Sequence, residues 1–173
     1  VEIVLLGSGY EFRRLDEIAA AGAPVIVPLT YPRRPSVDAL TSADRTTLRD
    51  MMTWEQGPTN PRRLASAGVT MTLTTAGLDD RADFRERLAD AIEHGLDERD
   101  ALAALTTIPA MLLGIESICG TIEAGKAAHF VVVDGSFFDP DAAIRATWVG
   151  GRRFEVERDD DAEPTYAGTL VVS

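Results

Sequence analysis

The sequence is poor in cysteine, histidine and lysine. Its 173 residues include one cysteine, Cys119, two histidines, and a single lysine, Lys126, beside sixteen arginines. One cysteine can form neither an internal disulfide nor a multi-thiolate metal site, and such sparse use is typical of proteins in a reducing compartment. The composition therefore favours a cytoplasmic location.

A long hydrophobic run and a basic surface are also missing. The longest apolar stretch, 18–29, contains Gly22, Pro24 and Pro28, and it is too short to span a bilayer. The net charge is -11 and is spread over several acidic clusters. This charge argues against a broad basic field for nucleic acid or an anionic membrane, so we expect neither partner.

What remains is the composition of an ordinary globular protein, with 45% hydrophobic and 26% charged residues. A chain of this length can bury about 70% of the surface that it exposes when unfolded. Because it begins at Val1, within an apolar run and without an initiator methionine, we expect it to be a piece of a longer protein.

Strand and helix patterns alternate through residue 114, which predicts an α/β fold. Apolar runs at 1–6, 25–27 and 69–75 predict three buried strands. Strands that are joined through a helix pair in parallel, by a right-handed crossover. We therefore expect a parallel sheet with helices between its strands.

Cap residues place the helices of the middle segment. We expect one helix to begin at Ser42 and Asp44 and to end near Trp54, and a shorter one to follow with Asn60 as its cap. Phe84 and the apolar residues spaced four apart after it predict a further amphipathic helix.

The next helices lead into a region of different character. Asp97 is expected to cap a helix whose Leu102 and Leu105 face inward, and Pro109 to open a short one. From Thr121 onward short strands are expected at Thr121–Ile122, Phe130–Val133, Thr147–Val149 and Arg153–Val156. We therefore predict three units: 1–114, 115–156, and an acidic linker with a possible extra strand at 157–173.

Three blocks in the second half resemble the metal-dependent amidohydrolases. They are ALAALTTIPAMLLGI, TIEAGKAAHFVVVDG and ATWVGGRRF, in the family's order. The pattern is most similar to the imidazolonepropionase-like branch. The resemblance implies the C-terminal portion of a TIM-like (β/α) barrel, from its sixth to its eighth strand, with part of a small β-sandwich built from both ends of the chain.

The same resemblance implies where a metal would be held. Barrel chemistry lies at the C-terminal ends of the strands, and in this family an aspartate after the eighth strand binds the metal and acts as general base. Leu73–Leu78 aligns with that block and places Ala76 at the aspartate position, while Gly7–Gly9 stands where a histidine ligand could follow the sixth strand. We therefore expect no catalytic, cofactor-binding or metal-binding residue in this chain, and leave zinc or another divalent metal to a full-length parent.

Five other residues could carry chemistry, and each has a structural explanation. Asp79 and Asp80 could replace the missing aspartate only if their loop folded back, and we expect them to cap the next helix. His94 is expected at a helix end, where the dipole favours it, and His129 near a turn of the sandwich. Cys119 has no histidine near it in sequence and is expected to be buried.

The glycine turn and the loops near it have two interpretations each. Gly7–Gly9 precedes a helix and could bind an anion through backbone N–H groups, although Phe12 stands where a dinucleotide motif needs its third glycine. Trp54 could shape a substrate pocket or anchor a packed loop. Arg33 and Arg34 could bind a carboxylate or lie in a solvated loop.

The resemblance implies part of a protein that hydrolyses carbon–nitrogen bonds other than peptide bonds, and we expect this chain to be inactive alone. Two alternatives stay open: a noncatalytic relative that acts as a scaffold or binding module, and an anion-binding domain built on the glycine turn. The missing N-terminal part of the barrel is the expected partner. Exposed sheet edges also predict that the chain associates with itself.

Overall fold

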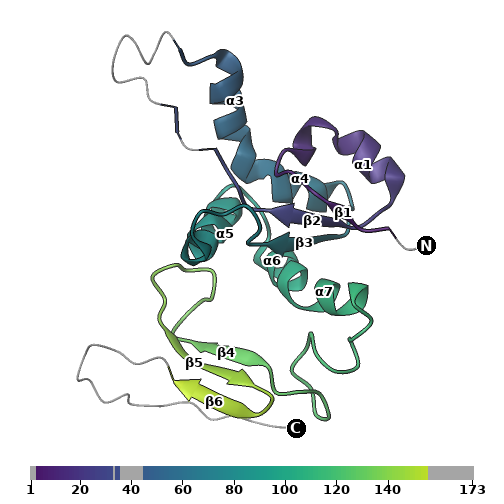
Figure 1. Cartoon of the computed structure of the whole chain (residues 1–173), viewed down its shortest axis with the longest axis vertical. Helices are drawn as coiled ribbons and strands as arrows, with labels where there is room; N and C mark the ends of the chain where they lie inside the picture. Colours follow the sequence, from purple (N-terminus) through teal and green to yellow (C-terminus); the bar gives the residue numbers. More distant parts are fainter. Residues whose placement is uncertain (1–2, 33, 36–44, 156–173) are drawn as a thin grey trace.

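A computed structural model describes residues 3–32, 34–35 and 45–155. These residues form two three-stranded sheets and the helices that accompany them (Figure 1). The strands are β1 (Leu5–Leu6), β2 (Val25–Pro28), β3 (Met71–Thr74), β4 (Phe130–Val133), β5 (Ile144–Val149) and β6 (Arg152–Glu155). The helices are α1 (Leu15–Ala21), α3 (Leu48–Gln56), α4 (Asn60–Ser66), α5 (Phe84–Glu93), α6 (Glu98–Leu105) and α7 (Thr107–Leu112), with 3-10 turns η1 (Glu11–Arg13), η2 (Gly57–Thr59) and η3 (Arg81–Asp83).

The first sheet is parallel and has the strand order β1-β2-β3. Val25 pairs with Met71 and Val27 with Leu73, so these four side chains share one face of the sheet. Val25, Val27 and Met71 are buried, and Leu73 packs against them. The predicted α/β content and parallel strands are thus present.

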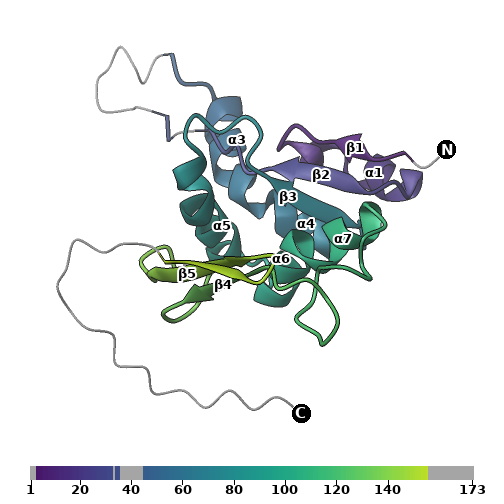
Figure 2. The ribbon, with the colours of Figure 1, turned by 60° about the horizontal axis from the view of Figure 1, so that its bottom comes forward.

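A row of helices lies beside this sheet, with α1 against α4 and α4 against α5 (Figure 2). The core between them includes Leu29, Leu64 and Leu88, which are fully buried. Burial of each of these leucines contributes about 2 kcal/mol before the entropy of ordering is set against it. Hydrophobic packing along this row therefore fixes the sheet's position against its helices.

The described residues form no closed barrel. β1 pairs with β2 alone, and its Leu6 side chain is 71% exposed. None of the described helices has the length and apolar character that a bilayer crossing needs. The sheet therefore has an open, apolar edge at β1.

The second sheet is antiparallel, in the order β4-β5-β6, and Phe130 stacks on Trp148 across its first pair with ring centroids 5.4 Å apart. Arg85 on α5 connects it to the first part of the chain. The Arg85 guanidinium donates to the carbonyl oxygens of Phe137, Asp139 and Ala142, in the loop between β4 and β5. The two sheets are therefore held together through α5.

The predicted start of the long helix is wrong. α3 begins at Leu48, and Thr47 is its N-cap in a capping box with Asp50. Ser42 and Asp44, which were expected to start it, lie outside the described residues. A threonine three residues before an aspartate is an equally good helix start, and the sequence does not rank the two.

Two further predictions in the second half are wrong. Leu102 is 50% exposed, because the residues of α6 that face inward are Ala101 and Ala104, both fully buried. Small side chains let α6 approach β3, which it contacts. Thr121–Ile122 forms no strand, and the segment 157–173, expected as a linker and strand, lies outside the described residues.

Candidate functional site

The C-terminal ends of β1, β2 and β3 meet around Thr30. A Cβ atom added to Gly9 would lie 3.2 Å from Thr30 Oγ1, and one added to Gly77 would lie 3.0 Å from Thr30 Cγ2. Both glycines have positive φ, +84° and +80°, which side chains of L residues rarely adopt. The segments that follow the three strands therefore converge at one place, as the barrel resemblance implies.

The glycine turn after β1 is occupied by a carboxylate of the chain itself. Glu11 is 6% exposed, and its Oε1 accepts hydrogen bonds from Gly9 N at 3.0 Å, from Ser8 N, and from Ser8 Oγ at 3.2 Å. A Cβ atom on Gly7 would lie 2.7 Å from the same oxygen. The hypothesis that this turn binds an external anion is therefore wrong, because Glu11 already uses its N–H groups.

Asn60 completes this buried network. Its Nδ2 donates to Glu11 Oε2 at 2.6 Å, and its Oδ1 accepts from Phe12 N at 2.8 Å. Asn60 is 1% exposed and is the first residue of α4, which has Thr59 as N-cap without a side-chain bond. The prediction that Asn60 caps a helix is therefore wrong, since its side chain reaches η1 instead.

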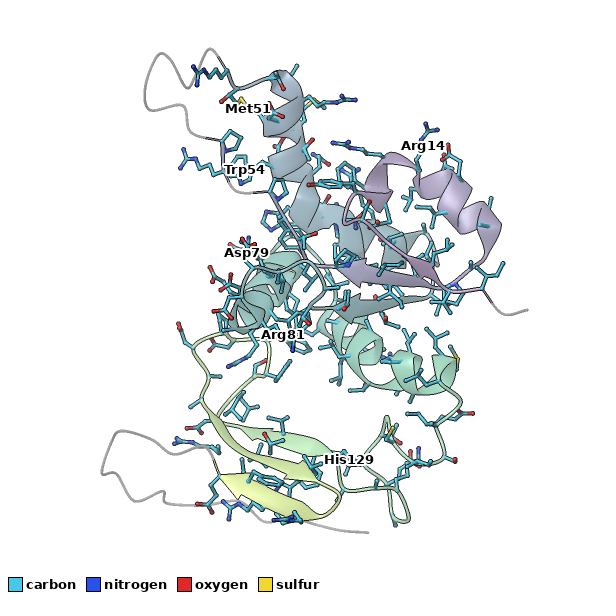
Figure 3. All side chains as sticks on the ribbon, in the orientation of Figure 1. Arg14, Met51, Trp54, Asp79, Arg81 and His129 are labelled. Carbon is cyan, nitrogen blue, oxygen red and sulfur yellow. The ribbon has the colours of Figure 1, made fainter. Side chains whose placement is uncertain are left out.

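The turn after β3 contains the position where the family resemblance implies an aspartate. Ala76 N donates to Thr74 Oγ1 at 3.1 Å, so the threonine hydroxyl is used within its own turn. Asp80 caps η3 by accepting from Ala82 N at 2.8 Å, as predicted. Asp79 lies on the same loop, above α5 (Figure 3), and has interactions of its own. The turn thus presents a methyl group where a carboxylate was sought.

These strand ends do not fit the metal that the family resemblance implies. Ser8, Thr30 and Thr74 contribute hydroxyl groups, Ala76 a methyl group, and Glu11 accepts hydrogen bonds from four donors. Within 3–32, 34–35 and 45–155, no group of three His, Cys, Asp or Glu side chains could hold a metal ion. Any residues that coordinate a metal would have to come from outside these strand ends.

The histidines and the cysteine lie apart from the strand ends. His94 is the C-cap of α5, with Nδ1 2.7 Å from the carbonyl oxygen of Asp90. His129 Nδ1 accepts from Gly150 N at 3.1 Å, beside the turn between β5 and β6, as predicted (Figure 3). Cys119 is half-buried, whereas burial was predicted.

Tyr31, three residues after the end of β2, has a hydroxyl group that is buried without a hydrogen-bond partner among the described residues. Burial raises the pKa of this phenol, and the charge of Asp90 adds to the shift. Tyr31 therefore stays neutral, and its ring packs against Gly57. Of the nearby loop residues, Trp54 is half-buried on α3, Arg34 is exposed, and Arg33 lies outside the described residues.

Comparison with known proteins gives a family and a fold. The model of the Amidohydrolase family matches residues 11–154. Adenine deaminase of Methanopyrus kandleri is 34% identical over 84 residues, which cover 49% of this chain and 13% of that protein. An amidohydrolase structure from Thermotoga maritima superposes with a TM-score of 0.65 at 26% identity, covering 88% of this chain and 37% of the other.

A more distant structure shows the fold alone. An adenosine deaminase from Xanthomonas campestris, determined with bound zinc, superposes with a TM-score of 0.54 at 20% identity, over 92% of this chain and 38% of that one. The chain thus spans well under half the length of the relatives it matches. Since the family model covers more than three quarters of its residues, the chain belongs to the amidohydrolase family.

Proposed function

We propose that this chain is the C-terminal portion of a hydrolase that cleaves carbon–nitrogen bonds other than peptide bonds, and that it shapes the site without supplying a metal ligand or a base. Family membership and the likeness to an adenine deaminase support a hydrolytic reaction. The proposal that the chain supplies neither a metal ligand nor a base rests on Ala76 after β3, because a methyl group can neither bind a cation nor accept a proton.

Hydrolysis of a carbon–nitrogen bond requires an activated water and a proton for the leaving amine. When a metal is bound in a hydrolase of this kind, it lowers the pKa of its water. Glu11 is the one buried carboxylate at the described strand ends, and it is fixed by Ser8, Gly9 and Asn60. Both proton transfers therefore fall to residues outside these strand ends.

The likeness to an adenine deaminase supports a nitrogen heterocycle as the substrate class. The adenine deaminase acts on a purine, and the imidazolonepropionase-like branch, to which the sequence blocks are most similar, supports the same class. We place the reaction in the cytoplasm because the chain has a single cysteine.

A noncatalytic scaffold is the second candidate, and Ala76 favours it as well. Elemental analysis of the protein purified at its natural length from its source, together with an ammonia-release assay on adenine, separates the two. Zinc at one or more atoms per chain with ammonia release supports the hydrolase. Neither zinc nor ammonia release supports the scaffold. The 173-residue chain alone is expected to give neither.

A further inference from the structure

The region around the C-terminal ends of β1, β2 and β3 is called the mouth. Arg13 lies beside it, in the turn η1 that follows the glycine segment after β1. The Glu11–Asn60 network holds this turn from below, since Asn60 Oδ1 accepts from Phe12 N at 2.8 Å. α3 rises beside η1 (Figure 1). Arg13 therefore projects from a fixed backbone toward a helix that follows β2 in the chain.

The Arg13 guanidinium is held in one position. Its Nη2 donates to Thr53 Oγ1 at 2.7 Å, and Thr53 Oγ1 in turn donates to the carbonyl oxygen of Arg49 at 2.7 Å. The Arg13 Cζ atom lies 5.1 Å from the ring centroid of Tyr10 and 5.8 Å from that of Phe12. These contacts fix the cation and leave most of its five N–H donors available.

Two adjoining clefts share Arg13, Arg49 and Thr53 in their walls. One, of about 440 Å³, adds Phe12, Leu48 and Met52 to them, and the other, of about 320 Å³, adds Tyr10, Pro32 and Asp50. Leu48 and Met52 are 74% and 53% exposed, which gives the first cleft an apolar wall open to solvent. Two arginines thus stand between an apolar and a polar recess.

The charge of these clefts is opposite to that of the whole chain, which carries -11. Asp50 is the single carboxylate among their described lining residues. Its Oδ2 accepts from Thr47 N at 3.0 Å and from Thr47 Oγ1 at 2.7 Å, and these bonds lower its pKa. No ion pair joins Arg13 or Arg49 to a carboxylate within the described part of the chain. Among the described residues, neither cation is paired with a carboxylate, so both can take part in binding an external anion.

We propose that Arg13 and Arg49 form an anion subsite at this mouth, which holds the carboxylate or phosphate group of a small organic ligand while Leu48 and Met52 contact its apolar part. A guanidinium fixed by other contacts binds such groups without a large loss of side-chain entropy. Under the proposed function, this subsite selects substrates with a negative charge remote from the bond that is cleaved. The binding itself does not depend on that function.

The test is titration calorimetry of the 173-residue chain with three probes of similar shape: benzoate, phenyl phosphate and the neutral benzamide. We expect saturable binding of one anion per chain in the millimolar range or tighter, and none of benzamide. Stronger binding of phenyl phosphate identifies phosphate as the group, and stronger binding of benzoate identifies carboxylate. Equal binding of benzamide, or no saturation with either anion, would overturn the proposal.

Three variants locate the site. Arg13→Gln and Arg49→Gln should each weaken anion binding by about tenfold. Arg14→Gln removes the same charge one residue away, but Arg14 lines neither cleft, lies away from α3 (Figure 3) and pairs with Glu17 at 3.0 Å. Anion binding by this variant should therefore stay unchanged. Arg49→Gln, on an exposed helix, guards against misfolding of Arg13→Gln. Equal loss in Arg14→Gln, or no loss in Arg49→Gln, would contradict the assignment.

These results are independent of turnover. If the 173-residue chain binds anions but the natural-length protein releases no ammonia, the anion subsite is supported and the hydrolase proposal is rejected. If the natural-length protein releases ammonia but no anion binds at Arg13, the hydrolase proposal is supported and the anion subsite is rejected.

Discussion

Asn60 Nδ2 donates to Glu11 Oε2 at 2.6 Å, across 49 positions of the chain. Through Glu11 this bond joins the first turn of α4 to the backbone N–H groups of Ser8 and Gly9, after β1. Both side chains are buried, so water does not replace either partner. The position of η1, and of Arg13 within it, therefore depends on this pair.

Replacement of Glu11 tests the network. Glu11→Ala leaves Ser8 N, Gly9 N and Asn60 Nδ2 without their acceptor, and we expect a loss of about 3 kcal/mol in the free energy of unfolding, measured by urea denaturation. Glu17→Ala removes an exposed carboxylate six positions later and should leave the unfolding midpoint unchanged. Equal stability of the two variants would show that the network contributes nothing.

Gly77→Ala tests the convergence of the strand ends. A positive φ of +80° costs an alanine roughly 1–2 kcal/mol, and its methyl group would also lie 3.0 Å from Thr30 Cγ2. Gly114→Ala is the matched control, since φ is +66° there and no atom lies within 4 Å. Gly77→Ala should thus lower the melting temperature more, and Thr30→Ser in the same chain should restore part of the difference. If the two alanine variants melt together, Thr30 does not crowd this turn.

Asp90 should make stability fall as pH rises. Burial raises the pKa of this carboxyl, against the opposing charge of Arg87. The folded protein then holds a proton that the unfolded chain releases above about pH 4, so stability decreases from there through the folded pKa. Asp90→Asn should unfold at a slightly higher urea concentration than the wild type near neutral pH and at the same concentration below about pH 4. If Asp90→Asn were more stable than the wild type by the same amount at every pH, titration of the Asp90 carboxyl would be excluded as the cause.

The open edge at β1 should cause self-association. We expect sedimentation velocity to show dimers or larger species at micromolar concentration, because the chain exposes Leu6 on an unpaired strand edge. Leu6→Lys should weaken the association. Leu113→Lys, equally exposed at 71% but after α7, should weaken it less. A wild-type chain that sediments only as a monomer would contradict the expectation.

The sequence predicts the elements well where a local pattern decides them. Val25–Val27 lies between turn residues and is present as β2, and the αL glycine Gly22 ends α1 as expected. The prediction that Leu102 faces inward is wrong because periodicity alone favours the larger apolar residue. Close packing of α6 on β3 buries Ala101 and Ala104 instead. Local sequence patterns therefore predict that a helix or strand exists, and which of the two it is, better than they predict which of its faces is buried.

The site is predictable only in part, for a physical reason. Ala76 and the glycine turn could be placed from the sequence blocks alone. Glu11 and Asn60 could not, because a contact between residues 49 positions apart leaves no local signal. The sequence pattern places Arg13 in an ordinary helix start, and only its bond to Thr53 shows that its side chain faces α3.

We expect no metal ligand at the end of β3, where Ala76 stands, and anomalous diffraction from zinc-soaked crystals of the chain tests this most directly. We predict no zinc peak coordinated by any atom of residues 74–80. A peak about 2.0–2.2 Å from a carboxylate oxygen of Asp79 or Asp80 would contradict the account.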